Sequence, residues 1–344
     1  MVEITCKNTN ETKSFPKGLN LQQLHEEFGN PLNGAVIAGV VNNHLRELDY
    51  EIFKPKIIEF LDIHHPLVKR MCLRSAIFVL YKAIRDLFPD ANLRVEHSMP
   101  GGVYCEIDNL PFPISQDMAH ALEVRTREII KDNLLFRRRQ IPTEKAVELF
   151  KKHRLIDKTN SIETRYEFFT SVYFLDDEVN YFYGYLLPST GYLPFLEFEF
   201  FGNGFLMKTP FSIEPGTSPK ANSDSKLYRI FRQYKEWLEV LDLQYIGDLN
   251  HRIEQKTDSD IIKIAEALHE KNIAFIADEI YKRKDVKMVL ISGPSSSGKT
   301  TFSKRLGVQL QVLGFNPVVI ELDNYFMDRE NTPRDENGEY DFEC

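Results

Sequence analysis

The chain has 344 residues, of which 42% are hydrophobic and 27% are charged, and its formal net charge is −8 at pH 7. This length allows two or three domains with ordinary hydrophobic cores. The negative charge argues against a protein that coats nucleic acid over its whole surface, although a local basic patch is compatible with it.

The cysteines and the N-terminus limit the cellular setting. Cys6, Cys72, Cys105 and Cys344 are scattered and form no C-x-x-C pair, so they predict neither a zinc site nor a disulfide framework. The N-terminus lacks the basic-then-apolar pattern of a signal peptide. No apolar run approaches the ~20 residues of a membrane span. We therefore expect a cytoplasmic protein without a membrane partner.

Residues 1–64 are predicted to form one small domain. Alternation in 2–6 and 12–15 predicts a hairpin, a helical pattern ends at Gly29, and 35–41 and 57–63 are strand-like. This order is typical of a β-grasp domain. The segment VNNHLRELDY resembles the TGS domain of threonyl-tRNA synthetases. The resemblance implies an interaction module rather than an enzyme.

Residues 65–222 are predicted to form a second domain with its linker. Helical patterns cover 68–87, a stretch from Ser115 to Asp132, and a stretch that opens at Pro142. Aromatic residues are dense in 165–212, and Gly202-Asn203-Gly204 predicts a tight turn, which together indicate an antiparallel sheet. We interpret the aromatic residues as core packing, with base stacking as the alternative.

Four segments of this region resemble the editing domain of threonyl-tRNA synthetases: RSAIFVLYKAIRDLFP, EHSMPGGVYCEID, PTEKAVELFKK and LLPSTGYLPFLEFEFFGNG. That family's H-x-x-x-H pair falls on Arg74 and Phe78, and its Cys and His before P-S-T-G fall on Phe182 and Leu186. None of these side chains can do the work of the family's residues. The resemblance therefore implies an editing-like α+β fold with a degenerate site that neither hydrolyses aminoacyl esters nor binds metal.

Other polar residues of the front region are interpreted conservatively. A lone histidine such as His97, or the pair His64-His65, is expected to be structural. Arg137-Arg138-Arg139 with Lys151-Lys152 form a basic patch that is either a solvated face or a contact for RNA or phosphate.

Residues 223–285 are predicted to be a helical connector that follows a linker in 212–226. The apolar stripe around Trp237 is interpreted as core: Leu227, Ile230, Phe231, Tyr234, Trp237, Leu238 and Leu241. A second helix is predicted from about Asp258.

Residues 293–301, GPSSSGKTT, match the phosphate-binding pattern G-x-x-x-x-G-K-[ST]. An apolar run at 286–291 before it and another at 317–322, which ends at Asp323, predict buried parallel strands. Between them a helix is predicted up to Gly314. The expected phosphate contacts are Gly293, Ser295, Ser296, Ser297, Gly298, Lys299, Thr300 and Thr301.

The runs GPSSSGKTTFSKRL and LDNYF resemble the uridine kinase and phosphoribulokinase family. The resemblance implies ATP and Mg²⁺ as cofactors and a nucleoside as substrate. It implies catalytic roles for Lys299 and Asp323, and a Mg²⁺ ligand at Thr300, with Asp323 as a further candidate. It also implies substrate contacts by Tyr325, Phe326 and Glu343.

The predicted architecture is a multidomain α+β front, TGS-like and then editing-like, followed by an incomplete α/β P-loop kinase domain in residues 286–344. Only 43 residues follow Thr301, so we expect a fragment of a nucleoside kinase that by itself binds only nucleotide phosphate. A natural relic that binds phosphate is one alternative. An RNA- or tRNA-binding module and a P-loop NTPase switch are two others.

Overall fold

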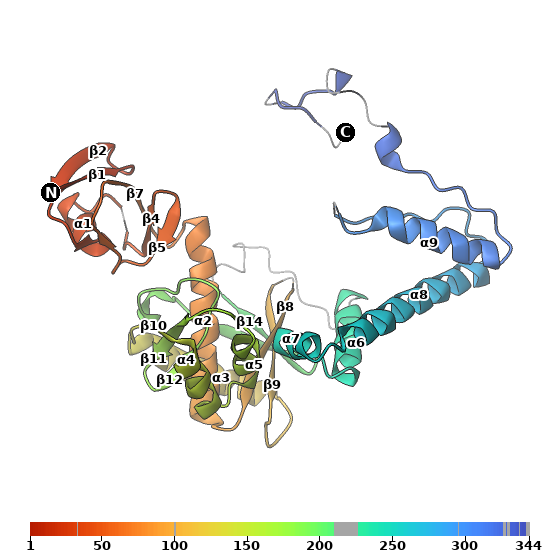
Figure 1. Ribbon diagram of the computed structural model, residues 1–344, viewed down its shortest axis with the longest axis horizontal. Coiled ribbons are helices and arrows are strands. Elements are labelled where there is room, and N and C mark those ends of the chain that lie inside the picture. The colour runs from red at the N-terminus through yellow and green to blue at the C-terminus, as the bar shows by residue number, and fades with distance from the viewer. Residues whose placement is uncertain are drawn as a thin grey trace. The chain divides into compact units, whose positions relative to one another are not determined.

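The computed structural model is an α+β chain with two compact units, Met1–His251 and Arg252–Cys344 (Figure 1). It describes residues 1–32, 34–99, 101–209, 226–294, 296–325, 328, 331–336 and 338–341, with only the backbone of Asp323. The predicted linker therefore lies largely outside the described residues. The division of the chain into four domains remains a prediction.

The N-terminal region is a mixed five-stranded sheet with one helix. Its elements are β1 (Val2–Cys6), β2 (Glu11–Phe15), β3 (Leu19–Asn20), α1 (Leu21–Glu27), β4 (Ala38–Val41), β5 (His44–Arg46), β6 (Glu51–Ile52) and β7 (Lys56–Leu61). The strand order is β2-β1-β7-β4-β5, with β1 and β7 parallel. Asn20 caps α1, and Leu21 and Leu24 are fully buried among the strand residues. This arrangement confirms the predicted α+β front.

The second region packs two sheets and several helices around α2 (Pro66–Leu87). Its other elements are β8 (Asn92–Met99), β9 (Gly102–Asp108), α3 (Gln116–Lys131), β10 (Arg137–Pro142), α4 (Thr143–Lys152), α5 (Ile156–Glu163), β11 (Phe169–Leu175), β12 (Glu178–Asn180), β13 (Glu197–Phe201) and β14 (Gly204–Lys208). The sheets are β10-β11-β12 and β13-β14-β9-β8. Helix α2 contacts α3, β8 and β11, and its middle turns are buried. Ser115 caps α3 and Gly202 lies in the β13–β14 turn, as predicted.

Helix α6 (Lys226–Val240) packs on the second sheet with only part of the predicted face. Tyr228 and Phe231 join a cluster with Tyr104 and Phe201. Phe231 belongs to the predicted core stripe, and Trp237, Leu238 and Leu241 of that stripe are half-buried. By contrast, Ile230 is 60% exposed, and Leu227 and Tyr234 are also exposed. The interpretation of the stripe as core is therefore wrong for these three residues.

The second unit is built on α8 (Asp258–Lys282) and α9 (Lys299–Val312); α7 (Ile246–Glu254) lies at the boundary between the units. Ile273 and Ala277 of α8 pack against Leu306 and Leu310 of α9. Gly314 follows the C-cap of α9 with a φ of +89°, as its sequence position predicts.

The two buried strands predicted in this unit are not found among its described residues. Leu290 is 85% exposed and Val318 is 83% exposed. A parallel strand becomes buried only when neighbouring strands and helices cover it, and no described segment pairs with 286–291 or 317–322. The prediction of an α/β sheet here is therefore wrong. In the part of the chain that is described, no helix is long and apolar enough to cross a membrane.

Candidate nucleic-acid interface

Three of the four positions that correspond to the editing residues, Phe78, Phe182 and Leu186, lie in or against one hydrophobic core. Phe78 lies one turn after Arg74 on α2, and its ring centroid is 5.3 Å from that of Phe182. Phe78 also stacks on Phe136 at 6.0 Å, and Leu186 is buried in the same core. Aromatic packing therefore fills the place of the family's reactive groups. The described residues hold no cluster of His, Cys, Asp or Glu that could bind a metal.

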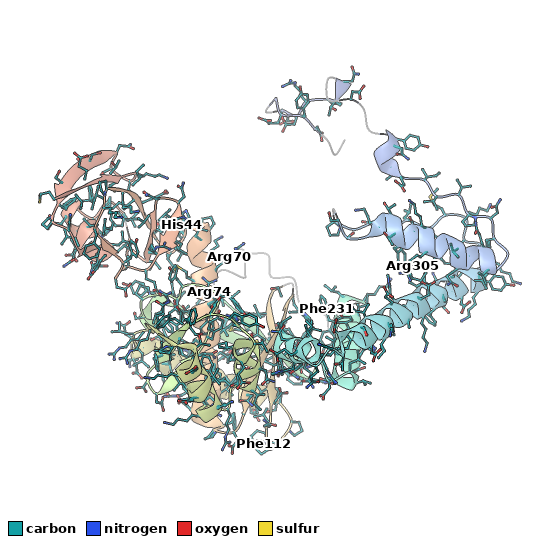
Figure 2. The ribbon with its side chains drawn as sticks, in the orientation of Figure 1. His44, Arg70, Arg74, Phe112, Phe231 and Arg305 are labelled. Carbon is teal, nitrogen blue, oxygen red and sulfur yellow. The ribbon has the colours of Figure 1, made fainter. Side chains whose placement is uncertain are left out.

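Arg74 has a structural role that the sequence does not reveal. Its Nε and Nη2 donate to the carbonyl oxygen of Tyr185 at 3.0 and 2.8 Å. The guanidinium lies flat over Gly184, where a Cβ would be 3.0 Å from Cζ. Gly184 also has a φ of +142°, which side chains disfavour. Arg74 thus fixes the backbone of 184–185. Figure 2 labels Arg74 on α2.

Two further arginines converge on Tyr185. Arg46 of β5 donates to the Tyr185 hydroxyl at 3.4 Å, and Arg138 of β10 lies over the Tyr185 ring at 5.2 Å. We call Arg46, Arg74 and Arg138 the arginine cluster. Its members come from three elements that are far apart in the sequence, and all three are at least partly exposed. The fold therefore concentrates positive charge that the overall composition conceals.

One carboxylate, that of Glu47, balances part of this charge. It accepts from the Tyr173 hydroxyl at 2.7 Å and pairs with Arg138 at 3.6 Å. Burial raises the pKa of Glu47, opposed by the Tyr173 hydrogen bond and the Arg138 charge. Burial also lowers the pKa of Arg74. Asp49 adds a second negative charge close enough to raise the pKa of Glu47. Three guanidinium groups beside these two carboxylates still leave an excess of positive charge, which is the electrostatic requirement for binding phosphate.

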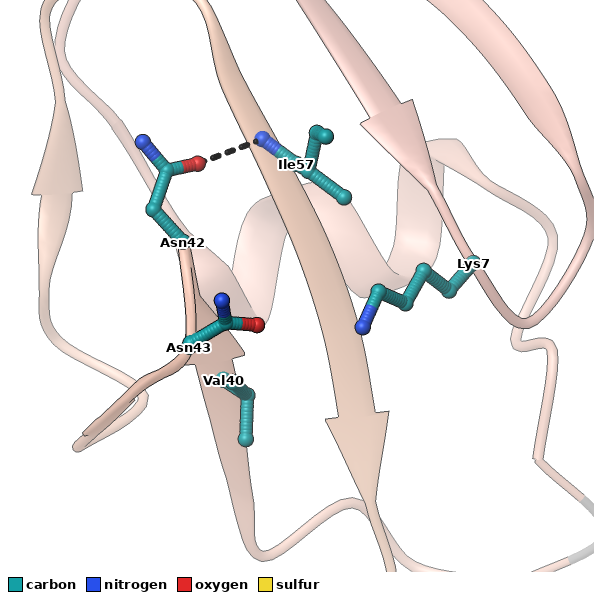
Figure 3. Close-up of a pocket in the computed structure, with 5 residues that line it drawn as sticks. All are labelled: Lys7, Val40, Asn42, Asn43 and Ile57. Carbon is teal, nitrogen blue, oxygen red and sulfur yellow. Dashed lines mark hydrogen bonds between the residues drawn. The ribbon is translucent and has the colours of Figure 1, made fainter.

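Local sequence explains how Arg46 is placed. Asn42 and Asn43 have φ values of +46° and +67°, the signature of the tight turn that joins β4 to β5. The Asn42 Oδ1 accepts from the Ile57 backbone N at 3.0 Å, which anchors the turn to β7. Beside the turn lies a pocket of about 250 Å³ lined by Lys7, Val40, Asn42, Asn43 and Ile57 (Figure 3). Its lysine pairs with Glu59 at 3.2 Å, so this pocket is not a second cationic site.

A larger pocket of about 530 Å³ lies near the start of β8 and the α4–α5 loop. Its cations are paired: Arg154 with Asp90, and Lys151 with Glu163. The pairing neutralises the pocket, so it offers no excess charge to an anion.

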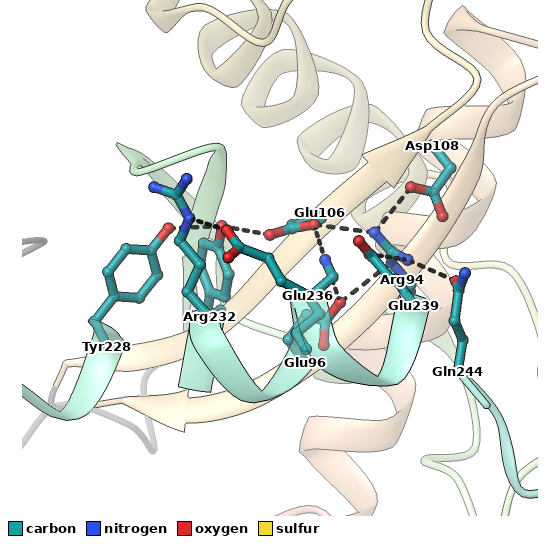
Figure 4. A network of polar contacts seen from close by, with 11 residues as sticks. Arg94, Glu96, Glu106, Asp108, Tyr228, Arg232, Glu236, Glu239 and Gln244 are labelled. Atoms are coloured by element: carbon teal, nitrogen blue, oxygen red, sulfur yellow. Dashed lines mark hydrogen bonds and ion pairs between the residues drawn. The ribbon is translucent and has the colours of Figure 1, made fainter. Parts of the chain in front are cut away.

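The charged residues under α6 also form a closed network (Figure 4). Lys235 contacts Glu96 at 2.9 Å and also pairs with Glu106. Arg94 contacts Glu96, Glu106 and Asp108, each at 3.1 Å. These mutual contacts hold α6 on the sheet, so the network is structural.

Two of the histidines singled out in the sequence make contacts within the fold. The His97 ring stacks on Phe231 at 4.0 Å, and the His65 side chain caps the N-terminus of α2.

The glycine-rich loop of the second unit leads directly into α9. Gly298, with a φ of +83°, precedes α9, and Lys299 Nζ donates to the carbonyl oxygens of Gly293 and Pro294 at 2.7 and 2.9 Å. Ser296 has a φ of +61°, and Gly293 approaches Ser297 closely. The lysine is therefore curled over the loop at the N-terminus of a helix, where backbone N–H groups attract anions.

The remaining predicted residues of this unit are not brought to the loop by any described contact. Thr300 and Thr301 are exposed on the first turn of α9, and Tyr325 is exposed in the short 3₁₀ turn Leu322–Tyr325. Ser295, Phe326, Glu343 and the side chain of Asp323 lie outside the described residues.

The comparisons with known proteins concern about half of the chain. It is 27% identical to the threonine–tRNA ligase of Clostridium kluyveri over 192 residues, which are 56% of this chain and 30% of that protein. It is 28% identical to that of Streptococcus agalactiae over 191 residues, or 56% of this chain and 29% of that protein. It is 27% identical to the threonine–tRNA ligase of Desulforamulus reducens over 162 residues, which are 47% of this chain and 25% of that protein. No protein-family model matches the sequence.

These relatives support the TGS-like and editing-like front and correct the predicted activity. They are ligases, and this chain spans less than a third of their length. The prediction that the protein is a nucleoside kinase is wrong, because the named relatives are threonine–tRNA ligases.

Arg138 belongs to the basic patch that the sequence predicts, and Arg74 occupies one of the editing positions, but the meeting of both with Arg46 at Tyr185 was not predicted. Its signals were present in the Arg46-Glu47 pair and in the run YFYGY at 181–185. Neither segment indicates by itself that the two will meet.

Proposed function

We propose that the first unit binds RNA, and that transfer RNA is the class of ligand it recognises. One observation carries the proposal: the arginine cluster gathers three guanidinium groups around Tyr185, and only Arg138 among them is paired with the carboxylate of Glu47. The relatives, which are named as threonine–tRNA ligases, support tRNA as the class.

The three arginines have different roles in this proposal. Arg46 and Arg138 are the phosphate contacts, because a planar guanidinium donates two parallel hydrogen bonds to phosphate oxygens. Arg74 is a positioning residue, since two of its donors hold the Tyr185 carbonyl. Arg138 is the most exposed of the three, and a phosphate would replace its contacts with Ser171 and Glu47. Phosphate contacts of this kind fix the position of the RNA and carry no sequence information.

Titration of a tRNA transcript at several salt concentrations, followed by fluorescence anisotropy, tests the proposal. Replacing Arg46 and Arg138 by Ala should reduce the slope of log K against log salt by roughly 1.4 to 1.8, because two phosphate contacts are lost. A matched control replaces Arg154 and Arg232, which are exposed and paired with Asp90 and Glu236, and loses the same charge. Equal slopes for both double variants would rule out the cluster as the RNA contact.

We propose, as a second function, that the loop of the second unit binds the phosphates of a nucleotide such as ATP with Mg²⁺. The supporting observation is Lys299, whose ammonium is held by loop carbonyls that a phosphate would replace as its partner. Gly293, Ser296, Ser297, Gly298 and Lys299 would hold the phosphates. The hydroxyl of Thr300 is the ligand offered to Mg²⁺.

Calorimetric titration with ATP and Mg²⁺ tests this second function. Binding should be weak and should disappear in Lys299→Ala, because the only charge proposed for the phosphates is removed. Lys304→Ala, a lysine on the same helix, is the control and should bind as the wild type does. Binding that survives Lys299→Ala would exclude the loop.

A further inference from the structure

A second group of side chains continues from the arginine cluster along the same segment. Arg165 Nη1 donates to the Tyr181 hydroxyl at 2.7 Å, and Nη2 donates to the Tyr183 hydroxyl at 2.5 Å. The guanidinium also lies over both rings, at 5.1 and 5.2 Å. The two rings meet edge to face, with centroids 5.0 Å apart. We call Arg165, Tyr181 and Tyr183 the stacking platform.

The stacking platform is partly exposed to solvent. Tyr183 is 73% exposed, although its ring is held in one orientation by Arg165. Tyr181 and Phe182 are both half-buried against the core, with Phe182 next to Phe78 and Tyr173, and only Tyr183 is largely exposed. An aromatic ring fixed in this way loses little conformational entropy when a ligand stacks on it.

The loop that carries Arg165 exposes two more aromatic side chains. Tyr166 is 99% exposed and Phe168 is 88% exposed. The loop backbone is nevertheless anchored: Thr143 N donates to the Phe168 carbonyl at 3.0 Å, and the Thr143 hydroxyl donates to the Glu167 carbonyl at 2.5 Å. Exposed large aromatic side chains on an anchored backbone mark a binding surface rather than incomplete packing.

From this geometry we infer that the stacking platform binds unpaired bases of RNA, so that the ligand class of the first unit is RNA with a single-stranded segment. The inference rests on the proposed RNA binding. In a duplex the bases stack on one another, so their faces are not available to Tyr183. In a single strand each base offers a π face to an aromatic ring or a guanidinium plane.

Each exposed or half-buried tyrosine of the segment is paired with a guanidinium group. Tyr183 and Tyr185 flank Gly184, where the backbone bends with a φ of +142°. Arg138 lies over Tyr185 and Arg165 lies over Tyr183. A single strand of RNA lying along 181–185 would meet a tyrosine ring together with a guanidinium group at both Tyr183 and Tyr185. A protein ligand needs no such repeated pairing, so we favour RNA.

Anisotropy titrations with three probes of equal length test the inference: a single-stranded oligouridylate, the same backbone without bases, and a blunt RNA duplex. The wild type should bind the oligouridylate more tightly than the abasic strand by about 5- to 150-fold for one stacked base. Tyr183→Ala and the pair Tyr166→Ala with Phe168→Ala should remove most of this advantage and leave abasic binding unchanged. Tyr183→Phe keeps the ring and should retain the advantage, as should the control Phe275→Ala, an exposed aromatic residue of the second unit.

The outcomes separate the two proposals. Equal wild-type affinity for oligouridylate and abasic strand, or duplex affinity that matches the oligouridylate, would overturn the stacking inference while leaving salt-dependent RNA binding intact. Absence of salt-dependent binding to any RNA, including tRNA, would overturn the proposed function itself. Loss of affinity for all probes in Tyr183→Ala but not in Tyr183→Phe would also contradict stacking, because abasic binding does not depend on a base.

Discussion

Similar apolar runs are buried in the first unit and exposed in the second. In the first unit, residues 57–61 become the central strand β7, flanked by β1 and β4, and Ile58 and Phe60 are buried. In the second unit, the run at 286–291 stays largely exposed. Each run has the composition of a buried strand. The difference lies in the partners, because only the first run finds strands to pair with among the described residues.

The largest expected effect of a substitution concerns the core that fills the former editing position. Phe78→Ala should destabilise the first unit by about 3–5 kcal/mol, because it removes a fully buried ring that packs on Phe136 and Phe182. Denaturant unfolding followed by tyrosine fluorescence measures the change. A loss below about 1 kcal/mol would mean that neighbouring side chains fill the cavity without cost, so that Phe78 does not lie in a close-packed core.

A smaller loss is expected at Gly184. Gly184→Ala should cost about 1–3 kcal/mol through its positive φ, and it should also weaken tRNA binding because the added Cβ displaces Arg74. Gly29→Ala is the matched control: its φ of +80° is also unfavourable, but a Cβ there meets nothing within 4 Å. The control should lose stability without losing RNA affinity. Equal RNA affinity of Gly184→Ala and Gly29→Ala would show that the position of Arg74 does not affect RNA binding.

A pH effect of modest size is expected from Glu47. Its raised pKa means that it takes up a proton at a higher pH than an ordinary glutamate does. Protonation removes the negative charge from the arginine cluster, so RNA affinity should increase as the pH falls through that pKa. Glu47→Gln should bind RNA more tightly at pH 7 and lack this component of the pH dependence. If the RNA affinity of the wild type and of Glu47→Gln, measured by anisotropy, depended on pH in the same way, Glu47 would not be part of the RNA site.

The smallest effect is expected in the second unit. Leu290→Asp should change the free energy of unfolding by no more than about 0.5 kcal/mol, because the side chain is already exposed. The same substitution at Ile58 in β7 should be severely destabilising. A large loss at Leu290 would show that the run is buried in the folded protein and would remove the contrast between the units.

Local patterns predicted much of the fold, and long-range contacts decided the rest. The caps at Ser115 and Gly314, the turn at Gly202 and the long helix α2 follow from neighbouring residues, and all are present. The short helix α5 lacks a strong apolar period and was missed. The arginine cluster was missed because Arg46, Arg74 and Arg138 meet only through the packing of β5, α2 and β10. The ion pairs of Lys235 in α6 with Glu96 and Glu106 join segments far apart in the sequence, so the sequence of α6 alone does not reveal them.

The parallel pairing of β1 with β7 has a consequence for synthesis of the chain. Ile4 lies opposite Lys56 and Cys6 lies opposite Ile58, so the first strand acquires its second neighbour only after more than 50 further residues have been made. Until β7 leaves the ribosome, β1 has only the hairpin with β2, which is marginally stable alone. We therefore expect this region to remain unfolded until β7 has emerged, and then to fold in one step at about the time that the first turns of α2 emerge.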